Sequence, residues 1–268
     1  TYGSKNKLSI GSLGAQGCSR SGAFSIQNSD LILVFGSRLN SLTTGPDFKK
    51  FGRHAKVIVI DIEKKEHSKK SIKIDRLIET NIKLFLLELN KYKFQHHKKK
   101  WVKKCIYWKK LFSKNSVNKL HIDPKSKIDL MELSRVFSKV LRKKSAFICD
   151  SGFVDVILPS NIKFGENQYC IHPSSQGSMG FALPAIMGVS QNNDINEIIA
   201  VIGDGSFMMN MQELQTIFHH KINCKIFIVN NNVYSIIRRR QKDLFRNRTI
   251  GTDINNGVSC PDFKKISK

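Results

Sequence analysis

The fold of the second half of the chain follows from residues 196–234, NEIIAVIGDGSFMMNMQELQTIFHHKINCKIFIVNNNVY. Two apolar runs, 196–203 and 225–229, predict strands, and the residues between them predict a helix over 207–220. The apolar side chains of that helix recur at helical spacing, at Phe207, Met211, Leu214 and Phe218. This order predicts a right-handed crossover between parallel strands, whose carboxyl ends meet at one edge of the sheet. We expect functional side chains at that edge.

Glycine, acidic and amide residues stand where these two strands end. The segment GDGS lies at 203–206 and NNN lies at 230–232, with 24 residues between the last glycine and the first asparagine. A carboxylate and an amide oxygen at neighbouring strand ends are hard ligands that suit Mg²⁺. Ser206 would open a helix whose free N–H groups favour a phosphate. The alternative is an ordinary turn between strand and helix, capped by Asp204 or Ser206.

The remaining segments extend the alternation of strands and helices to both halves of the chain. Residues 30–36 and 56–62 are continuous apolar runs, typical of parallel strands buried on both faces. Helical spacing follows over 71–90. In the second half, 130–141 predicts a helix and 145–150 a strand. The sequence therefore predicts an α/β protein with two parallel-sheet units.

Charge is distributed unevenly over the 268 residues, which carry 45 Lys and Arg against 21 Asp and Glu, a formal net charge of +24. Residues 91–127 hold 13 basic side chains and one acidic side chain. Residues 1–90 hold 15 basic and 8 acidic side chains, and residues 128–268 hold 17 basic and 12 acidic side chains. We therefore predict domains over 1–90 and 128–268, joined by a basic connector over 91–127.

Two interpretations fit the basic connector. It could be a nucleic-acid-binding arm in which Trp101, Tyr107 and Trp108 stack on bases. It could instead be a Lys-rich linker helix whose Trp101, Ile106 and Trp108 pack on a domain. We favour the second, because Lys outnumbers Arg here and no recognised nucleic-acid module surrounds the segment. A nucleic-acid partner is therefore not expected.

The six cysteines form no CxxC pair, and the histidines do not cluster as zinc ligands would. The cysteines are typical of free thiols in a reducing compartment, so we predict a cytoplasmic protein. No apolar run approaches the roughly 18 residues that a membrane span requires, so no membrane association is expected.

The two strand-end motifs belong to a longer resemblance. GDGSFMMNMQELQTI (203–217) followed by FIVNNNVYSII (227–237) resembles the thiamine diphosphate motif of the acetolactate synthase-like family of 2-oxo acid enzymes. The resemblance includes HPSSQGSMGFALPAIMG (172–188) and Pro261-Asp262-Phe263. In the first half, GSLGAQG (11–17), SDLILVFGSRL (29–39) and VIVIDIE (57–63) resemble the middle domain of that family.

The resemblance implies a cofactor site for thiamine diphosphate and Mg²⁺. The metal would be bound by Asp204, the side chain of Asn231 and the main-chain carbonyl of Val233. The Gly177 carbonyl would accept a hydrogen bond from the 4′-amine of the cofactor, and Met179 would wedge beneath the bent cofactor. Met179 could alternatively be ordinary core filler. The full set implied for cofactor binding is Gly177, Ser178, Met179, Gly203, Asp204, Gly205, Ser206, Asn231, Val233 and Tyr234.

The resemblance also implies an activity. The cofactor would add to the ketone of a 2-oxo acid such as pyruvate, carbon dioxide would leave, and protonation or attack on a second carbonyl would follow. An acetolactate synthase-like enzyme is the leading prediction, and a 2-oxo acid decarboxylase or a specialised carboligase is the alternative within the family. Outside it, the alternatives are a cofactor-binding remnant without catalysis and a basic nucleic-acid-binding protein.

In this family, an activating Glu lies on an amino-terminal pyrimidine-binding domain that meets the diphosphate-binding domain across a subunit interface. That domain is absent from this sequence, and the diphosphate-binding domain is expected to be truncated at its carboxyl end. We therefore expect a part of a longer, homo-oligomeric enzyme, inactive by itself, whose catalytic residue is unknown. Glu213, which follows the GDG motif, is not expected to replace the activating Glu.

The sequence departs from the family at three places. RRRQ (238–241) replaces a segment with a Trp that shapes the pocket for the second substrate. The flavin-associated RFDDRVTG is RLNSLTTG at 38–45, which loses the acidic centre and weighs against FAD. GQHQ, which contacts the diphosphate, is GFVD at 152–155.

Two further features have open interpretations. Arg238, Arg239 and Arg240 could attract an anionic substrate or coat a helix surface; we favour the surface role for Arg239 and leave Arg240 open. Asp61 stands where a dinucleotide-binding fold contacts a ribose, but no GxGxxG precedes it. We interpret Asp61 as part of a middle domain without a cofactor.

Overall fold

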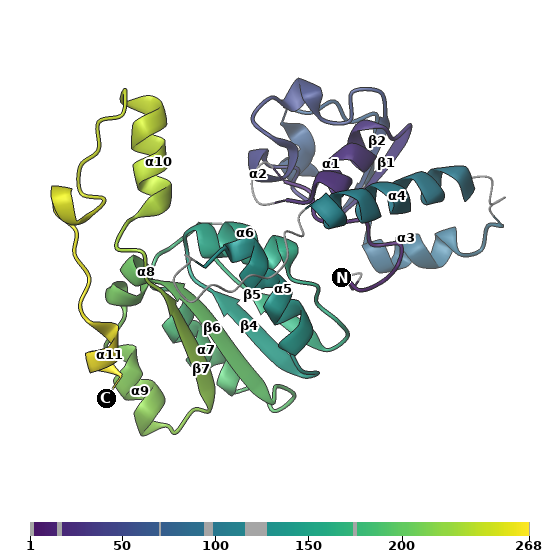
Figure 1. Ribbon diagram of the computed structural model, residues 1–268. Helices are drawn as coiled ribbons and strands as arrows, with labels where there is room; N and C mark the ends of the chain where they lie inside the picture. Colours follow the sequence, from purple (N-terminus) through teal and green to yellow (C-terminus); the bar gives the residue numbers. More distant parts are fainter. Residues whose placement is uncertain are drawn as a thin grey trace. The chain divides into compact units, whose positions relative to one another are not determined.

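In a computed structural model of the chain, the described residues are 3–14, 18–69, 71–93, 99–115, 128–173 and 176–267. They fall into two units, an N-terminal unit within 4–126 and a C-terminal unit within 127–268 (Figure 1). Each contains a parallel sheet, with strand order β1-β2-β3 in the first and β5-β4-β6-β7 in the second. The predicted fold class, two parallel-sheet α/β units, is confirmed.

The helices and strands of the N-terminal unit follow one another in the order α1, β1, α2, β2, β3, α3 and α4, with short 3₁₀ turns at Phe48–Lys50 and Lys64–Ser68. Their bounds are α1 Arg20–Gln27, β1 Leu31–Phe35, α2 Ser41–Thr44, β2 Lys56–Asp61, β3 Arg76–Glu79, α3 Ile82–Leu89 and α4 Lys99–Asn115. The core lies on one face of the sheet. It gathers Ile32, Val34, Leu39, Phe51, Val57, Val59 and Ile72.

The strands predicted over 30–36 and 56–62 are confirmed. The prediction that both faces of the strand are buried is wrong for β1. Leu31 and Leu33 are exposed while Ile32 and Val34 are buried. Among the described residues, the outward face of β1 has one aromatic contact, between Phe35 and Phe85 of α3 at a centroid distance of 6.0 Å. An edge strand covered on one face alternates in burial, although its sequence is apolar throughout.

The helix predicted over 71–90 is wrong in its first part, because residues 76–79 form β3. The strand pairs in parallel with β2, with Ile60 opposite Ile78. The helix α3 then begins after Asn81, whose side chain accepts a hydrogen bond from the Lys83 N–H at 2.8 Å. An N-cap of this kind ends the strand and starts the helix. The apolar residues Leu77 and Ile78 therefore belong to a strand.

Asp61, at the end of β2, is engaged within its own unit. One carboxylate oxygen lies 3.0 Å from Nε2 of the buried His67, and the other accepts the Glu63 N–H at 3.1 Å. The hydrogen bond with His67 lowers the pKa of Asp61. These contacts agree with the interpretation of Asp61 as a structural residue.

The helix α4 falls in the predicted basic connector and packs on α1. Trp108 is buried, and its ring lies 5.8 Å from that of Phe24 and 5.8 Å from that of Trp101. The side chain of Tyr107, by contrast, is 59% exposed. The structure therefore assigns residues 99–115 to the N-terminal unit, with one predicted stacking residue buried. Residues 94–98 and 116–127 of the connector lie outside the described residues.

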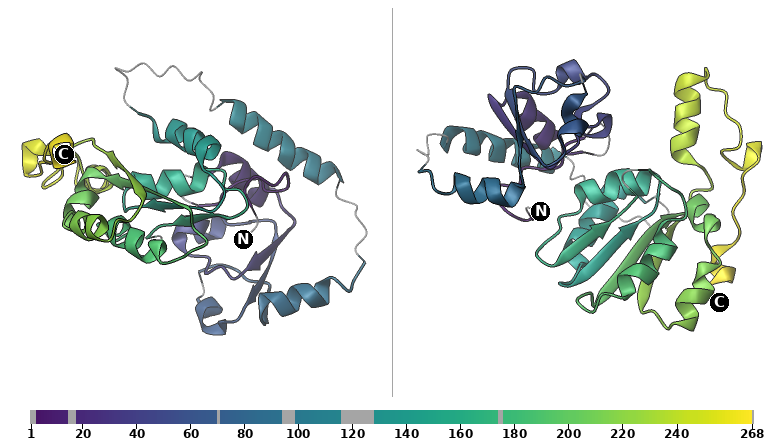
Figure 2. Two further views of the ribbon diagram at one scale, coloured as in Figure 1. Left: turned by 90° about the horizontal axis from the view of Figure 1, so that it is seen from below. Right: turned by 180° about the vertical axis from the view of Figure 1, so that it is seen from behind.

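The C-terminal unit is a four-stranded sheet with helices on both faces (Figure 2). Its bounds are α5 Leu130–Val140, β4 Ser145–Cys149, α6 Phe153–Asn161, β5 Gln168–Ile171, α7 Ala182–Ser190, β6 Glu197–Gly203, α8 Asp204–Met209, α9 Glu213–His219, β7 Cys224–Val229, α10 Ser235–Leu244 and α11 Phe263–Ile266. Phe147 and Val201 face α5 and α6. Ile148 and Ile202, one position along, face the opposite side with α7 and α9. Because successive side chains of a strand point to opposite faces, β4 and β6 each contribute to a core on both sides of the sheet.

The strands predicted at 145–150, 196–203 and 225–229 and the helix at 130–141 are confirmed, and β6 pairs in parallel with β7. The single helix predicted over 207–220 is wrong. The chain leaves helical geometry at Asn210, so α8 and α9 are separate, and Phe218 is 78% exposed. No helix within the described residues is long and apolar enough to cross a membrane.

All six cysteines are free thiols, and two of them lie in the core beside α6. Burial, reinforced by the charge of Asp155, raises the pKa of Cys170 to about 12. Burial likewise raises the pKa of Cys149 well above its ordinary value. These thiols are protonated at neutral pH.

Trp108→Ala should lower the free energy of unfolding of the N-terminal unit by about 3 to 5 kcal/mol, because a buried aromatic ring is lost from the α1–α4 contact. The control Tyr107→Ala removes a neighbouring exposed side chain and should change the free energy of unfolding by no more than about 0.5 kcal/mol. Urea denaturation followed by tryptophan fluorescence measures both, with Trp101 as the remaining tryptophan in Trp108→Ala. Equal effects of the two substitutions would contradict the packing of α4.

Cys170 in the folded protein should resist iodoacetamide at pH 8, because the reactive thiolate is scarce and the side chain is partly buried. Mass spectrometry of alkylated peptides measures this, with the urea-unfolded chain as control. Since folding raises the pKa of Cys170 from 9.0 to about 12, its contribution to stability is intact below pH 9 and is lost as the pH rises toward 12. Equal alkylation in native and unfolded protein would disprove the shift.

Candidate functional site

The candidate site lies at the carboxyl ends of the strands of the C-terminal unit. Gly203, the last residue of β6, pairs with Val229, the last residue of β7. The residues that follow, Asp204 and the 230–232 turn, are therefore neighbours although 25 residues or more separate them in sequence. The parallel pairing brings the two halves of the predicted motif to one place.

The carboxylate of Asp204 joins these two halves directly. Its side chain is almost fully buried. Oδ2 accepts the backbone N–H groups of Asn231 at 2.9 Å and Asn232 at 2.5 Å, and Oδ1 accepts that of Gly205 at 2.7 Å. A buried carboxylate requires such donors, because burying an unpaired charge is costly. Asp204 thus fixes the turn after β7 to the end of β6.

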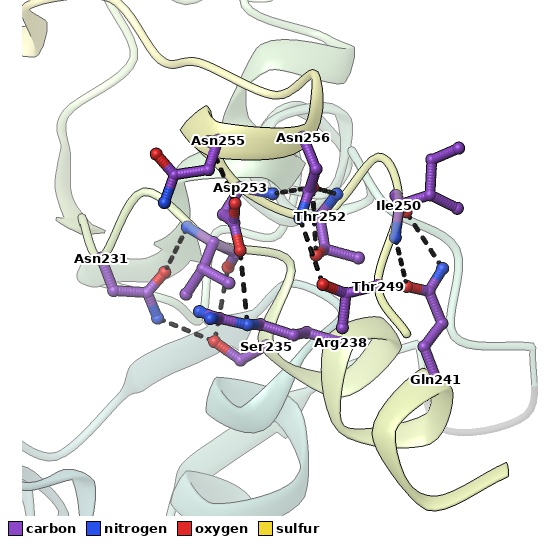
Figure 3. A network of polar contacts seen from close by, with 11 residues as sticks. Asn231, Ser235, Arg238, Gln241, Thr249, Ile250, Thr252, Asp253, Asn255 and Asn256 are labelled. Atoms are coloured by element: carbon purple, nitrogen blue, oxygen red, sulfur yellow. Dashed lines mark hydrogen bonds and ion pairs between the residues drawn. The ribbon is translucent and has the colours of Figure 1, made fainter. Parts of the chain in front are cut away.

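Asn231 and Val233 lie in this turn and are both hydrogen-bonded to Ser235. Figure 3 shows the side chain of Asn231 beside that of Ser235. The amide oxygen of Asn231 accepts the Val233 N–H at 3.0 Å, and its Nδ2 donates to the Ser235 hydroxyl at 3.0 Å. The Ser235 hydroxyl donates to the Val233 carbonyl at 3.3 Å. The structure therefore brings the backbone of Asn231 to Asp204, while the Asn231 side chain is hydrogen-bonded within its own turn.

The predicted metal ligands are a carboxylate, an amide oxygen and a carbonyl oxygen, the donors that Mg²⁺ prefers. Each such oxygen has two lone pairs, and those of Asn231 and Val233 each accept one hydrogen bond in the structure. The donor types of the predicted ligands therefore suit a magnesium ion. Among the described residues there is no cluster of three or more His, Cys, Asp or Glu, and the predicted ligand set contains only one such side chain.

Gly205 and Tyr234 are in close contact. A Cβ atom on residue 205 would lie 2.0 Å from the Tyr234 ring, so a larger residue would displace that ring. Burial raises the pKa of the Tyr234 hydroxyl, and Cys260 and Asp204 add to the shift. Gly203 is the N-cap residue of α8 and has extended backbone geometry. Glycine at 205 thus allows the tyrosine to cover the start of α8.

Ser206, predicted to contact a diphosphate, is buried, and its hydroxyl donates to the Ser151 carbonyl at 3.1 Å. The hydroxyl therefore links the start of α8 to the turn after β4. Its backbone N–H lies in the first turn of the helix.

The GSMG segment at 177–180 forms a turn at the same edge. Gly177 has a left-handed backbone, with φ of +64°, and its N–H donates to the Pro173 carbonyl at 2.8 Å. Ser178 is exposed and Met179 is half-buried. The carbonyl of Gly180 accepts a hydrogen bond from Nδ2 of Asn210 at 2.7 Å. Ser174 and Ser175 of the quoted motif lie outside the described residues, as do residues 15–17 of GSLGAQG.

Asp150, at the end of β4, anchors this turn and is absent from the predicted site. It is fully buried, and its carboxylate accepts the N–H groups of Ser151 at 2.7 Å, Gly180 at 3.0 Å and Ala182 at 2.7 Å. The sequence does contain a clue, because Asp150 ends a predicted parallel strand as Asp204 does. Asn210, which breaks the predicted helix, also contacts the turn.

A second pair missed from the sequence joins α6 to the end of β5. Nδ1 of His172 lies 2.6 Å from a carboxylate oxygen of Asp155, and both side chains are largely buried. Asp155 belongs to the GFVD segment that replaces GQHQ. The substituted segment therefore places an acid at the start of α6 in contact with a histidine from the end of β5.

The three arginines after the turn lie on α10 and differ in environment. Nε of Arg238 lies 3.3 Å from a carboxylate oxygen of Asp253, within the polar network that ties α10 to the returning chain (Figure 3). Arg239 is exposed and pairs weakly with Asp243 at 3.8 Å, as the surface interpretation predicts. Arg240 is exposed. Arg238 thus connects α10 to the chain around Asp253.

Asp150→Ala should lower the free energy of unfolding of the C-terminal unit by about 2 to 4 kcal/mol, because three backbone N–H groups lose their acceptor. Asp194→Ala, at an exposed position, is the matched control and should cost no more than about 0.5 kcal/mol. Urea denaturation measured by circular dichroism gives both values. A loss at Asp150 as small as that at Asp194 would contradict the anchoring role.

Two family models match the chain. Residues 1–89 match the central domain of thiamine pyrophosphate enzymes, and residues 150–268 match their C-terminal TPP binding domain. The first covers the N-terminal sheet and the second contains every residue of the candidate site.

Curated relatives match along nearly the whole chain. The acetolactate synthase large subunit of Cyanidium caldarium is 28% identical and that of Haemophilus influenzae is 30% identical. Both matches span all of this chain, and they cover 45% of the first relative and 46% of the second. An acetolactate synthase of Mycobacterium bovis is 27% identical over 91% of this chain and 40% of its own length. The chain thus spans less than half the length of these relatives. The chain therefore carries the central domain and the C-terminal TPP binding domain of thiamine pyrophosphate enzymes and is a distant relative of acetolactate synthase large subunits.

Proposed function

We propose that this chain supplies the thiamine diphosphate- and Mg²⁺-binding part of an acetolactate synthase-like enzyme that acts on pyruvate or a related 2-oxo acid. The observation that carries the proposal is the contact of the buried Asp204 carboxylate with the N–H groups of Asn231 and Asn232. This contact holds the two halves of the metal and diphosphate motif together. The similarity to acetolactate synthases supports the substrate class.

Within this proposal, Asp204, Asn231 and the Val233 carbonyl hold the metal ion. Gly205 and the backbone of Ser206 face the diphosphate, and Gly203 keeps the start of α8 open to it. When bound, the cofactor would supply the nucleophilic carbon and the electron sink that decarboxylation of a 2-oxo acid requires.

The 177–182 turn takes the remaining cofactor contacts. Gly177 offers its carbonyl to the aminopyrimidine, with Ser178 and Met179 beside it and Tyr234 covering Gly205. Asp150 and Asn210 hold the turn in position through hydrogen bonds to the backbone of Gly180 and Ala182. The contribution of these residues is to fix the cofactor in one orientation, which lowers the entropic part of the barrier.

Flavin is left out of the proposal. The guanidinium group of Arg38 is paired with Glu66 at 3.1 Å, and Asn40 caps the short helix α2 through the Thr43 N–H at 3.0 Å. The segment that corresponds to the flavin-associated motif is therefore engaged within its own unit.

Carboligation to a product such as acetolactate is the outcome we favour, and simple decarboxylation is the alternative. A non-catalytic cofactor-binding protein is a further candidate. The nucleic-acid candidate is less favoured because Trp108 is buried and packs edge-to-face against Phe24 and Trp101, so its ring is not exposed for stacking on bases. Homo-oligomer formation and a cytoplasmic location stay predictions.

The experiment is a calorimetric titration of the chain with thiamine diphosphate, with Mg²⁺ or with EDTA. Binding should require Mg²⁺, and Asp204→Asn should weaken it by at least about tenfold, because the carboxylate ligand is lost. Asp243→Asn, which replaces an exposed carboxylate on α10, is the matched control and should bind as the unmodified chain does.

Circular dichroism of Asp204→Asn checks that the sheet is intact, and Asn231→Ala tests the same site through the side-chain ligand. Binding that does not require Mg²⁺, no binding at all, or equal affinity in Asp204→Asn would each overturn the assignment.

A further inference from the structure

The pair formed by Asp155 and His172 lies at the same carboxyl edge of the C-terminal sheet as the candidate site. Asp155 is in the first turn of α6, and His172 follows directly after β5. Nδ1 of His172 and a carboxylate oxygen of Asp155 are 2.6 Å apart. The side chain of His172 is 30% exposed and that of Asp155 is 16% exposed, so water screens their charges only in part.

The turn between β4 and α6 places this pair near the proposed diphosphate contacts. The carbonyl of Ser151, in this turn, accepts the Ser206 hydroxyl at 3.1 Å. Ser151 also lies beside Gly177, since a Cβ atom on Gly177 would be 3.8 Å from the Ser151 hydroxyl oxygen. From Ser151 to Asp155 the chain makes about one helical turn, roughly 5.4 Å. Asp155 therefore lies on the order of 10 Å from Ser206, about one Debye length at physiological ionic strength.

The other ionisable groups around Asp155 are thiols and one further carboxylate. Asp155 interacts electrostatically with Cys149 of β4 and Cys170 of β5. Burial raises the pKa of both thiols, so both are uncharged at neutral pH. The carboxylate of Asp150, next to Cys149, is bonded to three backbone N–H groups. Of these residue types, histidine is the one whose charge ordinarily changes between pH 5 and 8.

The protonation of His172 therefore sets the net charge of the pair. With a protonated histidine the pair is neutral, and with a neutral histidine it carries one negative charge. Building on the proposed function, we propose that Asp155 and His172 tune the affinity for the diphosphate, which weakens when His172 loses its proton. The physical reason is that an unbalanced carboxylate at this distance opposes the binding of an anion.

A purely structural role for the pair predicts the opposite result for one substitution. If Asp155 served only to hold His172 and the turn in place, replacing its charge would weaken cofactor binding or leave it unchanged. If Asp155 opposes the diphosphate, the same replacement strengthens binding. The direction of the change in affinity thus distinguishes the two roles.

The first test is a calorimetric titration of Asp155→Asn with thiamine diphosphate at saturating Mg²⁺ and pH 8.5. Binding should be at least about threefold tighter than in the unmodified chain, the effect of one unit charge about 10 Å away at an effective dielectric constant below that of water. The amide oxygen of Asn can still accept a hydrogen bond from Nδ1 of His172. Asp194→Asn, at an exposed position, is the matched control and should bind as the unmodified chain does. Equal or weaker binding by folded Asp155→Asn would overturn the proposal.

The second test compares the unmodified chain with His172→Gln at pH 5.5 and at pH 8.5. The ratio of the two affinities is used, because the ionisation of the cofactor itself affects both proteins alike. At pH 5.5 the unmodified chain should bind at least about threefold more tightly, and at pH 8.5 the two should bind equally, since the pair then carries the same charge in both. His220→Gln, at an exposed position, is the matched control, with a ratio of about one at both values. A ratio for His172→Gln that does not change with pH would contradict the role of this histidine.

Circular dichroism first checks that each variant is folded. Mg²⁺-dependent binding that neither Asp155→Asn nor His172→Gln changes would refute the role of the pair and leave the proposed function standing. No binding by any of these proteins would overturn both. If Asp155→Asn does not fold, the pH dependence of the His172→Gln ratio decides.

Discussion

Two buried carboxylates, Asp150 and Asp204, determine the shape of the carboxyl edge of the C-terminal sheet. They follow the neighbouring strands β4 and β6, and each accepts three backbone N–H groups. A carboxylate loses its hydration on burial, and only charged hydrogen bonds from the protein compensate for that loss. The segments that supply these donors, the 177–182 turn and the 230–232 turn, are therefore held at the strand ends.

This arrangement relates the fold to the proposed chemistry. The sheet is hydrophobic on both faces and carries no functional group there, so its contribution is to align the strand ends. The turns contribute backbone carbonyls, N–H groups and one amide side chain. The N-terminal unit, by contrast, uses its polar residues at the end of β2 for internal contacts, as the pairing of Asp61 with His67 illustrates.

Features set by local chemistry or by strand pairing could be predicted from the sequence. The juxtaposition of Asp204 and Asn231 is one, because parallel strands bring their carboxyl ends together. The sequence pattern does not distinguish the strand β3, because its residues also fit a helical period and the cap that starts α3 lies only at Asn81. The break at Asn210 depends on a hydrogen bond to Gly180, 30 residues away, which spacing alone does not reveal. The pairing of His172 with Asp155 likewise requires β5, a four-residue strand without a continuous apolar run to mark it in the sequence.

The helix α10 differs from the rest of the C-terminal unit in how it is stabilised. It has no buried residue, and it is attached through polar contacts such as the reciprocal hydrogen bonds between Gln241 and Ile250, at 3.0 and 2.9 Å. Elements with few apolar contacts open locally at a small cost in free energy, whereas buried strands exchange their amides only on global unfolding. Amide exchange should therefore be fast along α10 and slow along β6. Because Ser235, the first residue of α10, is hydrogen-bonded to Asn231 and Val233, local opening of this helix would disturb the proposed metal ligands.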